Sequence, residues 1–209
     1  MAEPLAPAGI TVRQPQRFAG GAILVTCVYG VALMIPALLA AMAVSVMPLG
    51  VGTILIPLLA VSLATVFLPF GFGNPYVARL VRSLPPPEGV EAGSFIVQLT
   101  LRPRVRSGLP ALLEDTDDVG WLGFSADALV FRGDSISLTV PFAQVRGLRS
   151  ESIGARGLYL YPRVSIETHG LAGVERLSFS DRGSCWLPTA RRRTAELRRR
   201  LAARLVPAG

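Results

Sequence analysis

The sequence contains no lysine, so all 21 of its basic residues are arginine. A GC-rich, bacterial coding bias would produce this composition, and so would selection for the planar, bidentate contacts that guanidinium groups make with phosphate or carboxylate. Histidine occurs once and cysteine twice, with no CxxC motif and no Cys/His spacing suited to a metal. These shortages argue against a zinc site and favour a domain that faces a reducing compartment.

Charged residues are missing from one long stretch, since Asp, Glu, Arg and His are all absent between Arg17 and Arg79. Within it, residues 19–47 and 53–72 form two apolar runs separated by a turn that contains Pro and Gly. Each run is long enough to cross a hydrocarbon core of about 30 Å as a helix. We therefore predict a transmembrane helical hairpin over 19–72. A cleaved signal peptide is the weaker alternative, because signal h-regions are only about 7–15 residues long.

The arginines that flank the two runs predict the orientation of the hairpin. Arg13 and Arg17 precede the first run, Arg79 and Arg82 follow the second, and the turn between the runs has none. Positive residues concentrate on the cytoplasmic side of membrane helices. The sequence thus predicts a multi-pass protein of the cell (inner) membrane with both termini cytoplasmic. Because neither run contains an ionisable residue, an anchor is favoured over an ion pathway.

The rest of the chain divides into a tail, a linker and one domain. Residues 1–18 are expected to be a flexible tail, and residues 73–93 a Pro-rich linker of stiff, extended chain. Residues 94–206 alternate between apolar and polar side chains, which is typical of half-buried antiparallel strands. Short strands at regular spacing are typical of a sandwich or barrel. Seven are expected, over 95–102, 119–124, 128–133, 135–142, 144–149, 158–168 and 173–180.

The domain ends in a predicted amphipathic helix over 188–206. Leu197, Leu201 and Leu205 repeat every four residues as an apolar stripe, and arginine occupies most of the remaining surface. The net charge of +7 is concentrated here, because residues 186–209 hold seven arginines and one acidic residue.

These arginines are the only candidate binding residues that the sequence offers. Near an anionic leaflet, each basic side chain contributes on the order of 1 kcal/mol to binding. The alternatives are an ordinary solvated helix face, which is weighted equally, and nucleic acid, which is the least favoured. The candidate contacts with anionic lipid are Arg191, Arg192, Arg193, Arg198, Arg199, Arg200 and Arg204.

No residue pattern predicts catalysis. His169 lies in a loop between two expected strands, without a second base or ligand at a suitable spacing. The acidic cluster at 114–118 lacks the glycine and the distal glutamate of a calcium loop, which favours a solvated loop. No GxSxG, HExxH, Walker A or GxGxxG motif occurs in a supporting context. We therefore expect no enzyme activity, no catalytic or metal-binding residues and no cofactor.

Four segments carry a resemblance to a known superfold: Gly120–Leu122, Leu129–Phe131, Val140–Phe142 and Val145–Leu148. Their order, within seven strands followed by one amphipathic helix, resembles the pleckstrin-homology (PH) superfold, and in particular bacterial PH-like and GRAM-type domains. Bacterial members are often tethered next to a pair of transmembrane helices. The resemblance implies a membrane-anchored α+β fold, in which a transmembrane hairpin precedes a PH-like seven-stranded antiparallel β-barrel or sandwich with a C-terminal helix.

The expected function is that of a non-catalytic integral membrane protein, which presents a cytoplasmic PH-like binding or scaffolding domain at the inner face of the membrane. A superfold does not specify a ligand. The expected partners are the lipid bilayer, anionic lipid headgroups, and a membrane protein or a second copy of the chain. The alternative is an accessory subunit of a larger membrane transporter or enzyme complex, recognised through its transmembrane hairpin.

Overall fold

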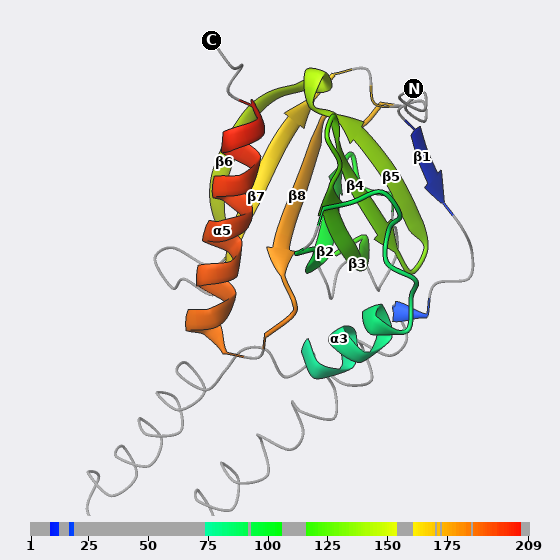
Figure 1. Ribbon diagram of the computed structural model, residues 1–209, viewed down its shortest axis with the longest axis vertical. Helices are drawn as coiled ribbons and strands as arrows, with labels where there is room; N and C mark the ends of the chain where they lie inside the picture. The colour runs from blue at the N-terminus through cyan, green and yellow to red at the C-terminus, as the bar shows by residue number, and fades with distance from the viewer. Residues whose placement is uncertain are drawn as a thin grey trace, which may run out of the picture.

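The computed structural model describes residues 9–12, 17–18, 74–91, 93–105, 116–153, 161–169, 171, 173–184 and 186–205. They form one antiparallel sheet of eight strands, with two α-helices packed against it (Figure 1). The helices are α3, Asn74–Arg82, and α5, Leu187–Leu205, and a short 3-10 helix, η1, spans Phe142–Gln144. The strands are β1 (Gly9–Val12), β2 (Phe95–Arg102), β3 (Asp118–Phe124), β4 (Ala128–Gly133), β5 (Ile136–Pro141), β6 (Val145–Ile153), β7 (Tyr161–Thr168) and β8 (Arg176–Asp181).

The sheet consists of two meanders that curve around one core. The strand order is β1-β5-β4-β3-β2-β8-β7-β6, so β2–β5 form one meander, β6–β8 form the other, and β2 pairs with β8. Phe131 on β4 and Phe179 on β8 have two strands between them in the sheet, yet their ring centroids lie only 6.5 Å apart. The inward side chains of both meanders form a single buried cluster with Leu197 and Leu201 of α5. The helix therefore closes a core that both meanders share.

Alternation along the strands explains which side chains enter this core. In β5, Ile136, Leu138 and Val140 are buried, whereas Ser137 and Thr139 between them are partly exposed. Successive side chains of a strand point to opposite faces of the sheet. The two faces of β5 are thus an apolar inner face and a hydroxyl-bearing outer face.

Two aspartates stabilise the hairpin between β4 and β5 and attach the N-terminal residues to it. The buried carboxylate of Asp118 accepts hydrogen bonds from two backbone N–H groups where β5 begins, at 2.9 and 2.6 Å. The carboxylate of Asp134, in the hairpin turn, accepts hydrogen bonds from the N–H groups of Arg17 at 2.5 Å and Phe18 at 2.9 Å. Phe18 is fully buried, so residues far apart in sequence meet at this turn.

A second, smaller cluster lies on the outer face of β2 and β3, where α3 packs. Pro75 stands near the start of α3, where a missing N–H group is tolerated. The indole N–H of Trp121 donates to the carbonyl of Leu84 at 3.3 Å, which holds the segment after α3 against β3. The buried residues of this cluster are Phe18, Val77, Ala78, Val81, Ile96 and Val119.

The transmembrane part of the predicted fold class needs correction. Neither helix in the described ranges combines the length and the apolar character needed to cross a membrane. The nine residues of α3 extend about 14 Å, roughly half of a hydrocarbon core, and α5 carries all seven candidate arginines. The described helices thus include no transmembrane hairpin. The predicted location, as a multi-pass protein of the inner membrane, depended on that hairpin and is corrected for the same reason. The predicted spans 19–47 and 53–72 lie outside the described residues.

The predicted closed barrel or sandwich of seven strands is also wrong. The sheet has eight strands, and within the described residues it is open, with β1 and β6 as its two edges. The additional strand is Gly9–Val12, which pairs with β5 although residues 1–18 are predicted as a tail. Similarly, the predicted linker 73–93 contains α3. The seven predicted strands and the C-terminal helix each correspond to an observed element.

Gly120 lies where β3 and β4 approach each other closely, and its substitution tests this contact. A Cβ atom at Gly120 would lie 2.3 Å from the carbonyl oxygen of Arg132 and 2.4 Å from the Cα atom of Gly133. Since both are backbone atoms, we expect Gly120→Ala to lower the free energy of unfolding by about 2–3 kcal/mol, measured by urea denaturation. Gly147→Ala is the control, because its nearest neighbour would be a carboxylate oxygen of Glu167 at 3.6 Å. Equal stability of the two variants would contradict the prediction.

Candidate functional site

Helix α5 sorts its arginines into two groups. With about 3.6 residues per turn, residues three or four apart share a side of a helix. Ala190, Thr194, Leu197 and Leu201 share one side and are buried against the sheet, as the predicted apolar stripe requires. Arg193, Arg200 and Arg204 lie along one flank of this stripe. The opposite flank and the side that faces away from the sheet carry Arg191, Arg192, Arg198 and Arg199, all of them exposed; we call these four residues the outer arginine face.

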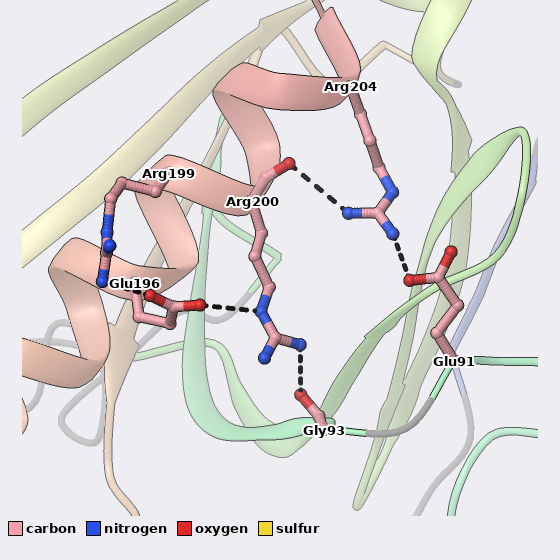
Figure 2. A network of polar contacts seen from close by, with 6 residues as sticks. All are labelled: Glu91, Gly93, Glu196, Arg199, Arg200 and Arg204. Carbon is pink, nitrogen blue, oxygen red and sulfur yellow. Dashed lines mark hydrogen bonds and ion pairs between the residues drawn. The ribbon is translucent and has the colours of Figure 1, made fainter.

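On the flank, Arg204 attaches the end of α5 to the chain that precedes β2. Its guanidinium forms an ion pair with the carboxylate of Glu91 (Figure 2). The same guanidinium lies over the ring of Phe124, with its central carbon 4.7 Å from the ring centroid. A cation over an aromatic face is attracted by the ring quadrupole. Arg204 therefore stabilises the packing of α5, and its side chain is only 21% exposed.

Arg200 makes a second attachment one turn earlier. Its guanidinium donates to the carbonyl oxygen of Gly93 at 3.2 Å and to the carboxylate of Glu196 at 3.0 Å (Figure 2). It also lies over the ring of Phe95, 5.3 Å from the centroid. Glycine suits position 93, because its φ of +100° is a backbone conformation that residues with a side chain rarely adopt.

At the other end of α5, Arg193 faces a buried carboxylate. Nη1 of Arg193 lies 3.7 Å from Oδ1 of Asp181, which is only 2% exposed at the end of β8. Burial raises the pKa of Asp181 to about 6, and the guanidinium of Arg193 together with nearby backbone N–H groups offsets part of this rise. Arg193 thus has an internal counter-ion.

The outer arginine face has fewer internal partners. Within the described ranges, Arg192 and Arg198 form neither an ion pair nor a hydrogen bond through their side chains. Arg199 forms an ion pair with Glu196, but its side chain remains 77% exposed. Trp186, which directly precedes the helix, is 63% exposed. A group of arginines and one large aromatic side chain are therefore presented to solvent at the same helix.

The structure thus divides the seven arginines that the sequence predicts as lipid contacts. It brings Arg191, Arg192, Arg198 and Arg199 together on one exposed face, and it directs Arg193, Arg200 and Arg204 to protein groups. Trp186 is an exposed residue beside this face that is not among the predicted contacts. Its position one residue before an arginine-rich helix is the signal that could have found it.

Two other features of the sequence have structural roles. Nδ1 of His169 lies 3.0 Å from the carbonyl oxygen of Gln144, in the loop where the sequence places it. The acidic cluster is only partly described, but Asp117 and Asp118 are fully buried, so a solvated loop is wrong for these two residues. The carboxylate of Asp117 accepts a hydrogen bond from the N–H of Leu101 at 2.7 Å. In the part of the chain that the structure describes, no group of three or more potential metal ligands occurs.

No protein-family model matches the chain, and no curated protein matches its sequence.

The raised pKa of Asp181 predicts how stability depends on pH. Burial raises the pKa values of Asp181 and Asp118 from 3.8 to about 6, so the folded protein binds more protons than the unfolded chain between these pH values. Through these two groups, stability should therefore fall as pH rises from about 4 to about 7.

Asp181→Asn removes one of these two buried charges. We expect this variant to be more stable than the parent at pH 8, by roughly 1–3 kcal/mol, and to lose less stability between pH 4 and 6. Urea denaturation at several pH values measures both effects. Asp127→Asn, at an exposed aspartate, is the control. An Asp181→Asn protein that is less stable than the parent at pH 8 would refute this account of the buried carboxylate.

Proposed function

We propose that the described domain is a non-catalytic binding module of the PH-like type, and that its ligand is the phosphate-bearing headgroup of anionic lipids. The outer arginine face of α5 is the recognition surface. The observation that carries the proposal is the division of the arginines: Arg193, Arg200 and Arg204 contact groups beside the sheet, whereas all four residues of the outer arginine face are exposed, including Arg199, whose ion pair is with Glu196 of the same helix.

The topology supports the PH-like assignment. Two antiparallel meanders, of four and three strands, are joined through their β2 and β8 strands, and one helix follows the last strand. The sequence resemblance implies this same succession of elements. β1 is an addition at the edge of the first meander. Since a fold does not specify a ligand, the ligand must be argued from the helix.

The chemistry of the outer arginine face supports an anionic ligand. Guanidinium groups form bidentate hydrogen bonds with phosphate oxygens and are charged at every physiological pH. Near an anionic lipid surface, each basic residue contributes about 1 kcal/mol. Arg192, Arg198 and Arg199 together would then change affinity by roughly a hundredfold.

Trp186 favours lipid over other anionic ligands. Tryptophan is enriched where a protein meets the interface between headgroups and acyl chains, because its ring is apolar and its N–H is polar. At 63% exposure, Trp186 is free to enter such an interface.

The fluorescence of Trp186 provides a local test. A Trp121→Phe background leaves Trp186 as the only tryptophan, because the chain has two. The purified full-length chain is added to vesicles of phosphatidylglycerol or of phosphatidylcholine, at low and at high salt. We expect a blue-shifted emission and protection from iodide only with phosphatidylglycerol at low salt. High salt should reverse both changes, because it screens exposed charges.

Two triple variants in this background locate the binding surface. Substitution of Arg192, Arg198 and Arg199 by Gln should lower the affinity for phosphatidylglycerol by about ten- to a hundredfold. The control replaces Arg79, Arg82 and Arg146, which are also exposed and lie elsewhere, and should bind as the parent does. Equal behaviour of the two variants, or equal emission with both lipids, would refute the proposal. Release of the chain by a single-stranded oligonucleotide at equal phosphate concentration would indicate nucleic acid instead.

A further inference from the structure

A cleft of about 370 Å³ opens on the outer face of the first meander, away from α5. Three segments that are distant in sequence border it: β1, the chain at Pro87 and Glu88, and the strands β4 and β5. Figure 1 shows β1 beside β5, at the edge of the sheet. β1 therefore supplies one wall of the cleft.

The register of the strands arranges the floor of the cleft in two rows. Ser137 of β5 is paired with Thr11 on one side and with Arg132 on the other. In the next row, Thr139 stands between Gly9 and Val130. Side chains that are paired across strands are about 5 Å apart, and the two rows are about 7 Å apart. Three hydroxyl groups and one guanidinium thus occupy neighbouring positions.

These polar groups have no partners of their own within the described residues. The side chains of Thr11, Ser137, Thr139 and Arg132 form no hydrogen bond or ion pair there, and neither does that of Glu88 at the border of the cleft. Polar side chains in the rest of the domain are often paired, as Arg176 is with both Glu151 and Glu167. The hydrogen-bonding capacity of the cleft is therefore available to a ligand.

The identity of these groups defines the class of ligand. A guanidinium and hydroxyl groups all donate hydrogen bonds to an oxyanion, and the guanidinium also neutralises its charge. Gly9 has no side chain, which leaves space at the end of the second row. Glu88 is acceptor-only when ionised and so suits an ammonium group, while Val130 and Pro87 provide apolar contact.

We propose that this cleft binds a small zwitterion, whose carboxylate or phosphate group contacts Arg132 and the hydroxyl groups and whose ammonium group contacts Glu88. Such a ligand bridges β1 and β5, because its oxyanion spans the row that contains Thr11 and Ser137. Ligand binding therefore stabilises the docked position of β1. This site is separate from the outer arginine face and does not depend on lipid binding there.

Calorimetric titration of the full-length chain with O-phosphoethanolamine tests the proposal, with inorganic phosphate and ethanolamine as partial probes. The protein carries the three substitutions of Arg192, Arg198 and Arg199 by Gln, so that phosphate binding to α5 does not contribute. We expect saturable binding with one site. Arg132→Gln should weaken binding at least about tenfold, whereas Arg146→Gln, at an exposed arginine outside the cleft, should have no effect.

The Glu88→Gln variant distinguishes the contact with the ammonium group of the ligand from the contact with its oxyanion. It should weaken the binding of O-phosphoethanolamine severalfold and leave that of inorganic phosphate unchanged or tighter. Hydrogen exchange gives a second readout, because the amides of residues 9–12 should exchange more slowly when the ligand is bound.

Several results would overturn the proposal. These are no saturable binding of O-phosphoethanolamine at about 1 mM, equal affinities of the Arg132→Gln and Arg146→Gln proteins, or unchanged exchange of residues 9–12 in the saturated protein. If phosphate binds as tightly as O-phosphoethanolamine and Glu88→Gln has no effect, the ligand of the cleft is a simple anion and not a zwitterion. Because Arg192, Arg198 and Arg199 are already substituted, none of these results bears on lipid binding at the outer arginine face.

Discussion

The pairing of β2 with β8 is the interaction on which the rest of the domain depends. Each meander is formed by strands that follow one another in sequence, whereas this ladder joins residues 97–102 to residues 176–181. It brings the inner faces of both meanders around one core, and it places the end of β8, where the chain turns into α5, beside β2. Without it, α5 would cover only the second meander. Arg200 and Arg204 would then lack Gly93 and Glu91, which lie directly before β2.

Because of the position of α5, its arginines have two different roles. Arg200 and Arg204 lie over aromatic rings and hold protein oxygens, a combination that suits a planar guanidinium better than the compact ammonium of lysine. Arg192 and Arg198 remain in solvent. Arg200 and Arg204 hold the helix at the first meander and so orient the outer arginine face. A binding surface that is already oriented loses less conformational entropy when a ligand arrives.

The two proposed sites lie on different parts of the sheet and rest on different contacts. The outer arginine face is on a helix that packs mainly on β7 and β8. The cleft lies on the outer face of β4 and β5, at the edge that β1 completes. Two buried or partly buried aspartates, Asp118 and Asp134, support the hairpin between these strands and hold the residues that follow β1. The described N-terminal residues therefore belong to the domain, although the sequence alone predicts that the domain begins at residue 94.

The sequence by itself determined the elements whose side chains repeat with a regular period. The alternation in 128–133 and 135–142 predicts β4 and β5 to within one residue, and the leucine stripe predicts α5 equally well. It did not predict β1 or α3, because four extended residues and nine helical ones are too short for a clear period and gain their stability from partners distant in sequence. It also identified the seven arginines, but only the tertiary structure decided which of them face the protein and which face solvent. That choice depends on where β2–β8 pairing places α5, a contact between residues about eighty positions apart that no local pattern encodes.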